Sequence, residues 1–344
     1  MRAVVIRRHG GPEVLELREW PDPHAGSGEV VIAVRAVSVG RTLDVAARAH
    51  GAALDAKLPR VPGSDPAGVV VEVGPGVTRF APGDRAVCTS TLFCGRCPSC
   101  VAGRTQACDE HRVVGVHIDG GDAERVSVPV TSVEPIAPGV NFEQAAAMAV
   151  SYPVAWNLLR EQGRVRAGDV VLVMGAGGAL GIAGVLVARA LGAHVIAAAA
   201  SDWKLERARE LLGADRTVNY SERGWADDLG GVDVVYENIS SPRLFCEALA
   251  TLRPYGRLVT SGAHGGDGTV PVDMRMLYRR HLSIIGGTGA SAAVTRDVFA
   301  AVGDGMIPPP PVFHRFSLEQ IAAAHEAALG RELFGRAIVT VGAP

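Results

Sequence analysis

The stretch VVLVMGAGGALGIAGVLVARALGAHVIAAAA, residues 170–200, decides the fold of this chain. It opens with an apolar run, residues 170–174, that is too short for a helix and suits a buried parallel strand. Glycines then cluster in a turn, and apolar residues recur with helical spacing until Gly192, which predicts a helix stop. Residues 195–200 predict a second strand. The order strand, tight turn, helix, strand is the unit of a parallel α/β sheet.

The glycine turn has the composition of a phosphate-binding turn. Glycine backbone can approach a pyrophosphate closely, and the N-terminus of the next helix offers free N–H groups and partial positive charge. We therefore predict a dinucleotide site. Alanine stands where the GxGxxG pattern has its first glycine, so a glycine-rich turn of another α/β protein is the alternative. The residues of the predicted site are Ala176, Gly177, Gly178, Ala179, Leu180 and Gly181.

Length and composition set further bounds. A chain of 344 residues suits two domains, and 48% hydrophobic residues with 42 glycines fit a compact α/β protein. The net charge of -2 argues against nucleic acid or an anionic membrane as the main partner. Glycines interrupt the uncharged run 170–188, which argues against a membrane span. The N-terminus lacks an apolar signal core, so we expect a cytoplasmic protein with reduced thiols.

The segments around residues 170–200 are of two kinds. Residues 1–130 predict short strands separated by Gly and Pro, as in an irregular β-barrel. From Phe142 the periodicity is helical up to Leu159, and beyond residue 200 helices and strands alternate, which predicts a doubly wound parallel sheet. A capping-box pair, Ser317 and Gln320, begins a last helix, and a final strand is expected to return to the first domain.

Four cysteines form a metal-binding pattern, Cys94, Cys97, Cys100 and Cys108. The spacing CxxCxxCx7C can close around one tetrahedral zinc ion, and four sulfur ligands leave no open position, so the predicted zinc is structural. A disulfide framework and an iron–sulfur cluster are the alternatives.

The whole chain resembles the medium-chain dehydrogenase/reductase superfamily. The matching segments are GSDPAG at 63–68, PGDR at 82–85, GGDAE at 120–124, AAA at 145–147, GRLV at 256–259 and FGRAIV at 334–339. The resemblance implies a GroES-like catalytic domain, residues 1–150 and 288–344, that carries the substrate. It also implies a Rossmann dinucleotide-binding domain, residues 151–287, with the cofactor in the cleft between the two domains.

The chain departs from the zinc alcohol dehydrogenases of that superfamily at the catalytic metal. The three ligand positions fall on Gly40 or Arg41, on Ser64, and near Val150, and none of these is a normal zinc ligand. Asp65 alone does not make a site. Without a Lewis acid, hydride addition to an activated C=C bond is easier than alcohol oxidation. The quinone oxidoreductase and enoyl reductase branch is therefore the part of the superfamily that the chain resembles most.

The predicted cofactor is NADP(H). An NAD site normally has an acidic residue after the second strand, whereas this strand ends in alanines at 197–200. Asp202 is the contrary observation, and we interpret it as a cap of the next helix. The resemblance adds a phosphate-binding tyrosine and two pyrophosphate-binding arginines, for which a solvent-exposed role is the alternative. Beyond the glycine turn, the predicted cofactor contacts are Ser201, Lys204, Tyr220, Arg336 and Arg41.

The predicted catalytic residues are Tyr152, Thr42 and Asp65. By resemblance, the turn that holds Tyr152 faces the nicotinamide, and Thr42 stands where zinc enzymes place a proton-relay hydroxyl. Three more polar residues are expected to line the cleft with Asp65, namely Asp44, Ser64 and His117. A structural role is the alternative for each of these residues, and solvent is the alternative proton source.

Three functions follow from these patterns. The first is an NADPH-dependent reductase of enones, quinones or enoyl thioesters. The others are an alcohol or polyol dehydrogenase whose zinc has unusual ligands, such as Asp65 and His117, and a non-catalytic NADPH-binding protein. The resemblance also implies a homodimer, formed through the sheet edge near residues 282–286, or a homotetramer.

Overall fold

The computed structural model describes residues 1–51, 55–262 and 268–342. The chain divides into two compact units. Unit 1 contains Met1–Val150, Ser291–Gly305 and Pro309–Pro344, and unit 2 contains Ser151–Ala290 and Met306–Pro308. In the described part of the chain, no helix combines the length and the apolar character needed to cross a membrane.

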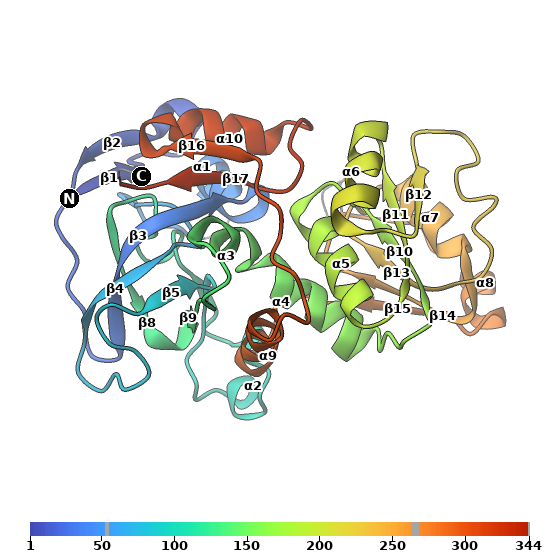
Figure 1. Cartoon of the computed structure of the whole chain (residues 1–344), viewed down its shortest axis with the longest axis horizontal. Coiled ribbons are helices and arrows are strands. Elements are labelled where there is room, and N and C mark those ends of the chain that lie inside the picture. Colours follow the sequence, from blue (N-terminus) through green and yellow to red (C-terminus); the bar gives the residue numbers. More distant parts are fainter. Residues whose placement is uncertain (52–54, 263–267, 343–344) are drawn as a thin grey trace. The chain divides into compact units, whose positions relative to one another are not determined.

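Unit 2 is built on a six-stranded sheet in the order β12-β11-β10-β13-β14-β15 (Figure 1). All neighbouring strands are parallel. The chain order reverses between β10 and β13, and ligands of such sheets bind at the carboxyl ends of the strands at this reversal. The predicted doubly wound sheet is confirmed. The strands are β10 (Val170–Met174), β11 (His194–Ala199), β12 (Arg216–Asn219), β13 (Val232–Glu237), β14 (Leu252–Thr260) and β15 (Ser283–Gly286).

Helices cover both faces of this sheet. Two helices connect strands that run toward one edge and two more connect strands that run toward the other edge, so right-handed crossovers place the two pairs on opposite faces. Leucine, valine and aromatic side chains of the sheet and of α7 form one buried core. The helices of unit 2 are α4 (Ser151–Trp156), α5 (Ala179–Ala190), α6 (Asp202–Leu212), α7 (Pro242–Ala250) and α8 (Met274–Arg279), with a π-helical turn η6 (Asn157–Gln162).

The predicted helix over residues 142–159 is broken. The α3 helix (Phe142–Met148) belongs to unit 1, and α4 begins in unit 2. Pro153 has no N–H to donate to the carbonyl of Ala149, which favours a break in the helix at this point. The alanine-rich pattern is correct for each half, and the proline was the overlooked signal.

Unit 1 is built on a seven-stranded sheet in the order β16-β17-β3-β4-β5-β9, with β8 also paired to β3 (Figure 1). The C-terminal strand β17 pairs with the end of β3, so the last segment returns to unit 1. The strands are β3 (Glu29–Val39), β4 (Ala67–Val73), β5 (Arg85–Cys88), β8 (Arg125–Pro129), β9 (Val133–Pro135), β16 (His314–Ser317) and β17 (Ala337–Thr340), with the pairs β1 (Arg2–Val5) and β2 (Glu16–Glu19), and β6 (Thr91–Leu92) and β7 (Arg112–Val113), beside them.

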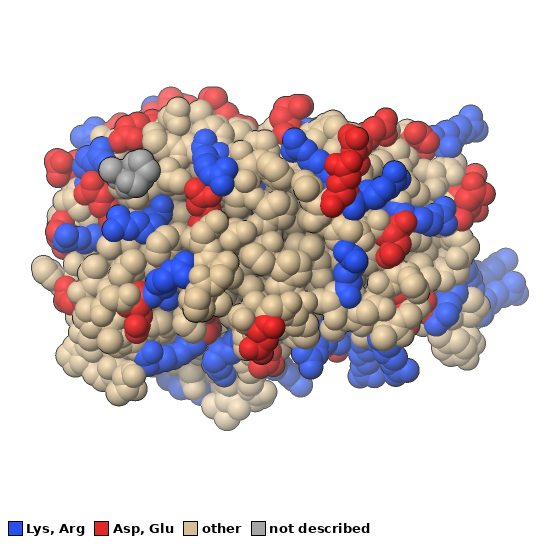
Figure 2. All heavy atoms as spheres, viewed as in Figure 1, with Lys and Arg blue, Asp and Glu red and all other residues tan. Residues whose placement is uncertain are grey.

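Short helices close this irregular barrel. Ser317 and Gln320 form the predicted capping box. The helices are η1 (Pro12–Val14), η2 (Arg41–Val45), α1 (Ala46–His50), α2 (Pro98–Val101), η4 (Thr105–Ala107), η5 (Val130–Ser132), α3, α9 (Ala292–Gly303), η7 (Leu318–Gln320) and α10 (Ile321–Leu329). On the face drawn in Figure 2, basic and acidic side chains are interspersed on both units, as the small net charge implies.

Candidate functional site

The glycine turn of unit 2 joins β10 to α5 with little space to spare. Gly175 has φ +68, a left-handed conformation that favours glycine, and its carbonyl accepts the N–H of Gly178 at 2.9 Å. A β-carbon on Gly181 would lie 2.6 Å from the Cα of Ala176 and closer still to the Gly175 carbonyl oxygen. Ala176 is buried and donates its N–H to Ala198 at 2.9 Å. The alanine that departs from the GxGxxG pattern is therefore accommodated.

The N-terminus of α5 can bind an anion. Its N-cap, Gly178, is extended and has no side chain, and the helix begins at Ala179. The first N–H groups of a helix have no partners inside the helix. No acidic residue occupies the first turn of α5. These groups, from Ala179 to Gly181, can therefore donate to a phosphate.

The helix that follows β11 brings a predicted cofactor residue, Lys204, to this turn. A β-carbon on Gly177 would lie 2.5 Å from Cδ of Lys204, so the lysine stem covers the turn. Ser201, rather than Asp202, is the N-cap of α6, and the carboxylate of Asp202 accepts from Nδ2 of Asn219 at 2.8 Å. The predicted capping role of Asp202 is therefore wrong, because its carboxylate accepts a hydrogen bond from Asn219 of β12 instead.

Tyr220 also lies at this end of the sheet. Its N–H donates to the carbonyl of Ala199 at 3.0 Å, and its ring packs edge-on against Trp225 with 6.5 Å between centroids. The structure thus places Tyr220 next to Ala199, the last residue of β11.

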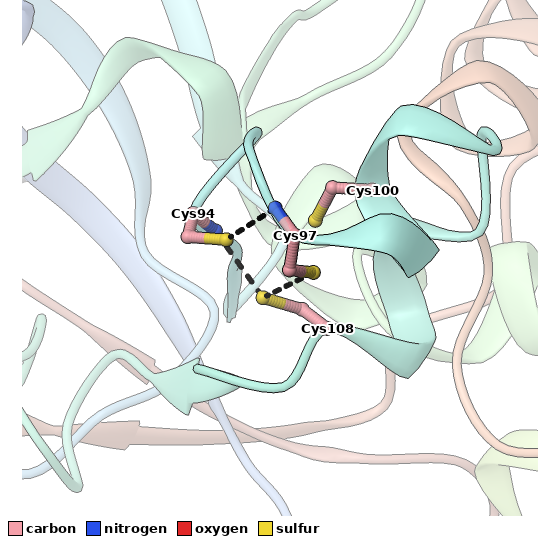
Figure 3. A group of neighbouring side chains, drawn as sticks. All are labelled: Cys94, Cys97, Cys100 and Cys108. Atoms are coloured by element: carbon pink, nitrogen blue, oxygen red, sulfur yellow. Dashed lines mark hydrogen bonds between the residues drawn. The ribbon is translucent and has the colours of Figure 1, made fainter.

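The four predicted zinc ligands converge in unit 1 (Figure 3). Their Sγ atoms all lie within 4.8 Å of one another, and those of Cys97 and Cys108 are 4.0 Å apart. Four sulfurs around a tetrahedral zinc, at about 2.3 Å from it, lie about 3.8 Å from each other. All four cysteines are free thiols. The geometry fits zinc, and none of the four cysteines forms a disulfide in this structure.

Backbone N–H groups prepare these sulfurs for a cation. The N–H of Cys97 donates to Sγ of Cys94 at 3.3 Å, and the N–H groups of Cys94 and Glu110 donate to Sγ of Cys108 at the same distance. Backbone N–H donors lower the pKa of Cys97 to about 7, whereas burial raises the pKa of Cys100 to about 12. The four cysteines would hold a closed, structural zinc that fixes the loop around them.

A second polar cluster in unit 1 joins two buried carboxyl groups through a serine. Asp44 accepts the N–H of Gly40 at 2.6 Å and the N–H of Ser64 at 2.9 Å. The Ser64 hydroxyl lies 3.3 Å from Oδ2 of Asp44 and makes a short contact with Oδ1 of Asp65. The other oxygen of Asp65 accepts the hydroxyl of Ser38 at 2.6 Å. Asp44 and Asp65 are 3% and 1% exposed.

A third carboxyl group and one guanidinium flank this cluster. Asp122 is 1% exposed, and neither of its oxygens has a hydrogen-bond partner in the described part of the chain. Burial raises the pKa of Asp44 to about 7, helped by the charge of Asp65, and burial raises the pKa of Asp65 and Asp122 as well. The guanidinium of Arg336 opposes this rise for Asp44 and Asp65.

The residues at the expected catalytic-zinc positions do not fit a zinc ion. A β-carbon on Gly40 would lie 2.5 Å from Nη1 of Arg336 and 3.1 Å from Oδ2 of Asp44, so a cationic side chain already fills the space that a ligand there would need. The Ser64 hydroxyl already contacts two carboxyl groups, those of Asp44 and Asp65. Among the described residues, the four cysteines are the one group of three or more His, Cys, Asp or Glu whose ligand atoms come together.

The remaining predicted site residues are Tyr152, His117, Arg41 and Thr42, and two of them are held by hydrogen bonds. The Tyr152 hydroxyl is buried and donates its proton to the carbonyl of Pro308 at 2.7 Å, and burial raises the pKa of Tyr152 well above its usual value. Nδ1 of His117 accepts the N–H of Val113 at 2.9 Å, which is a turn contact. Arg41 and Thr42 are exposed on η2. The structure therefore gives Tyr152 and His117 structural partners within their own units.

Sequence reasoning missed Ser38 and Asp122. The strand pattern around Ser38 predicts only alternation, and Asp122 lay in a segment, GGDAE, that was quoted for its resemblance without a role for its carboxylate. An aspartate that follows two glycines and precedes an alanine was the available signal.

Comparisons with known proteins bear on the whole chain. The family described as "Zinc-binding dehydrogenase" matches residues 179–303, and the "Alcohol dehydrogenase GroES-like domain" matches residues 26–138. An alcohol dehydrogenase of Geobacillus stearothermophilus is 30% identical over 99% of this chain and 100% of its own length. The chain belongs to the medium-chain dehydrogenase/reductase superfamily. It is therefore an oxidoreductase, and enzymes of this superfamily bind NAD(P).

Relatives within the medium-chain dehydrogenase/reductase superfamily have different activities. The acryloyl-coenzyme A reductase of Metallosphaera sedula is 30% identical over 99% of this chain and 100% of its own length. The quinone oxidoreductase of Mus musculus is 30% identical over 95% and 93%. A solved NAD-dependent alcohol dehydrogenase is 37% identical, with a TM-score of 0.93 over 99% of this chain and 100% of its own.

Proposed function

We propose that this protein is an NADPH-dependent reductase that adds hydride to an activated C=C bond of an enone, a quinone or an enoyl thioester, without a catalytic metal. One observation carries the proposal: Arg336 and the serine-bridged carboxyl pair fill the positions where zinc-dependent relatives would need ligands. The acryloyl-coenzyme A reductase and quinone oxidoreductase relatives support the reaction class.

The chemistry agrees with these residues. Oxidation of a plain alcohol develops charge on one oxygen, which a metal stabilises by several kcal/mol. Addition of hydride to a conjugated alkene gives an enolate, whose charge is delocalised and needs only hydrogen-bond donors. Bound NADPH would supply the hydride, and the residues of the chain bind the cofactor, orient the substrate and provide the proton.

The choice of NADPH rests on the end of β11. Alanines stand where an NAD site has its carboxylate, and the carboxylate of the nearby Asp202 accepts a hydrogen bond from Asn219 of β12. Lys204, whose stem covers the glycine turn, and Ser201, the N-cap of α6, offer a cation and a hydroxyl. Tyr220 lies next to the same strand end. We assign Arg336 and Arg41 to the pyrophosphate on resemblance.

An NAD-dependent alcohol dehydrogenase is the second candidate, favoured by the solved relative that is 37% identical. The deciding experiment measures consumption of NADPH and NADH with enones, quinones and enoyl thioesters, and formation of both reduced cofactors with alcohols. The proposal expects NADPH oxidation with at least one activated alkene or quinone. Turnover of alcohols alone would support the second candidate, and tight NADPH binding without any turnover would indicate a non-catalytic protein.

We also propose that the protein forms a homodimer through β15. This strand ends the sheet, and Ile284 on it is 36% exposed. Tyr255, Met274 and Tyr278 on neighbouring elements are more than 60% exposed. Unpaired strand edges with apolar neighbours favour pairing with a second copy. Ile284→Lys should convert the protein to a monomer in sedimentation analysis, whereas Leu211→Lys, a change of another exposed apolar residue, should not; an unchanged mass for Ile284→Lys would refute this interface.

A further inference from the structure

Several buried nitrogen atoms of unit 1 have no hydrogen-bond partner in the described part of the chain. They are Nε and Nη1 of Arg48, both ring nitrogens of His325, and Nδ1 of His9. Arg48 is 2% exposed and His325 is 0% exposed, so bulk solvent does not solvate either side chain. Buried polar groups are almost always hydrogen-bonded, and an exception requires an explanation. These atoms therefore indicate a partner that is not part of the protein chain.

The three side chains lie together although their positions in the sequence are far apart. The α10 helix, which holds His325, packs against η1 and η2, and η2 continues directly into α1, which holds Arg48 (Figure 1). Burial lowers the pKa of His325 to about 3, helped by the charge of Arg48, so these two side chains are close enough to interact. Gly10 donates its N–H to the Arg48 carbonyl at 3.2 Å, and a β-carbon on Gly51 would lie 2.8 Å from Nδ1 of His9. The segment before η1 therefore brings His9 to the same place.

The guanidinium of Arg48 also lacks a counter-charge at hydrogen-bond distance. Arginine remains protonated even where burial lowers its pKa, as it does for Arg48. The carboxylates of Glu13 and Glu326 act on Arg48 through their charges, but both residues are exposed and neither accepts a hydrogen bond from Nε or Nη1. A buried charge without a paired group is costly. A water molecule would satisfy the N–H groups and leave the charge uncompensated, whereas an anion would do both.

The two imidazoles add donors and limit the size of the ligand. A neutral imidazole carries one N–H donor, so His325 and His9 can each direct one hydrogen bond at an anion beside Arg48. His325 is neutral at ordinary pH because its pKa is low. Both Arg48 and His325 are almost completely enclosed by protein atoms. The ligand is therefore small, of the size of a halide ion rather than that of a phosphate ester.

We propose that Arg48 and His325, together with His9, bind one chloride-sized monovalent anion inside unit 1. The anion accepts N–H groups of the guanidinium and one N–H group of each imidazole, and it compensates the arginine charge. Because Arg48 lies on α1 and His325 lies on α10, the bound anion links the early part of unit 1 to its C-terminal helix. The inference concerns the stability of unit 1 and is independent of the proposed function.

Chloride should slow hydrogen exchange in the two linked helices. The whole protein is compared in chloride and in gluconate, an anion too large for the site, at equal ionic strength. Exchange of the α1 and α10 amides should slow about tenfold for each tenfold increase in chloride above its dissociation constant. Exchange in α7 of unit 2 should be the same in both anions.

Variants show whether the response belongs to this site. Arg48→Met keeps the stem of the side chain and removes the charge, so chloride should no longer slow exchange in α10. Arg60→Met is the matched control, because Nη1 of Arg60 is bonded to the Asp119 carboxylate at 2.9 Å, and it should respond to chloride as the wild type does. If Arg48→Met does not fold, His325→Leu, which removes one donor, should weaken chloride binding about tenfold. A chloride response in Arg48→Met equal to that of the wild type would overturn the proposal.

A bromide-soaked crystal of the wild-type protein locates the ion directly. We expect an anomalous bromide peak at hydrogen-bond distance from Nε or Nη1 of Arg48 and close to the ring of His325. Two results contradict the proposal: no bromide at this position, or bromide there without any effect of chloride on exchange in α1 and α10, which would show an adventitious ion only.

Discussion

Replacement of Gly181 by alanine should damage both the stability of unit 2 and cofactor binding. The new β-carbon would lie 2.6 Å from the Cα of Ala176 and closer still to the Gly175 carbonyl oxygen, whereas ordinary contact begins at 3.4 Å, so the start of α5 must move by at least about 0.8 Å. Backbone atoms cannot rotate away as side chains do. Overpacking of a dense interior costs about 1–3 kcal/mol, and we expect a value near 3 kcal/mol.

The same displacement moves the N–H groups of the first turn of α5 away from a bound pyrophosphate. A loss of about 1.4 kcal/mol there weakens the affinity for NADPH about tenfold. Urea unfolding followed by circular dichroism measures the first effect, and quenching of tryptophan fluorescence by NADPH measures the second.

Gly178→Ala is the matched control. Gly178 has an ordinary extended conformation with φ -90, is exposed, and has only the Gly175 carbonyl oxygen near it, at 3.5 Å. The unfolding free energy of Gly178→Ala should stay within about 0.5 kcal/mol of the wild-type value, while the added methyl group on the exposed turn should weaken NADPH binding. Wild-type stability and affinity for Gly181→Ala would refute the tight turn and the assigned site.

Three further predictions concern the other sites. Cys97→Ser should release the structural zinc and speed hydrogen exchange at the start of α9, because Ala292 donates its N–H to Thr105 in the cysteine loop at 2.8 Å; unchanged exchange would contradict that link. Lys204→Ala should weaken NADPH binding about tenfold to a hundredfold and leave NADH binding unchanged, with Lys57→Ala as the control, and equal losses for both cofactors would refute a 2'-phosphate contact. The pKa of Asp44 rises from 3.8 in the unfolded chain to about 7, so the folded state holds one more proton than the unfolded state between these pH values. The contribution of Asp44 to the unfolding free energy should therefore fall as the pH rises from about 4 to about 7, by at most about 1.4 kcal/mol per pH unit. In urea titrations Asp44→Asn should lack that fall, and a fall of the same size in Asp44→Asn would contradict the shift.

The sheet of unit 2 could be predicted from sequence because its signals are local. Its first strand is a short apolar run, and the strand predicted over residues 170–174 has those same bounds in the structure. The cysteine cluster was equally predictable, since its four ligands lie within fifteen residues of chain. Where a local signal was overlooked, as with Pro153, the prediction of a continuous helix was wrong.

The carboxyl cluster could not be predicted in the same way. Its members come from five separate segments of unit 1, around residues 38, 44, 65, 122 and 336, and only the folded sheet brings them together. Burial then changes the protonation of Asp44, which no spacing in the sequence reveals. The Tyr152 hydroxyl is a similar case, because its acceptor, Pro308, is 156 residues away in the chain.

The most direct test of a metal-free reaction is the number of zinc ions per chain, measured by elemental analysis of active protein purified without added metal. We predict one zinc, held by Cys94, Cys97, Cys100 and Cys108, and its loss in Cys97→Ser. Two zinc ions in the wild type, with one remaining in Cys97→Ser, would contradict the account of Gly40, Ser64 and Arg336 and would favour a zinc-dependent alcohol dehydrogenase.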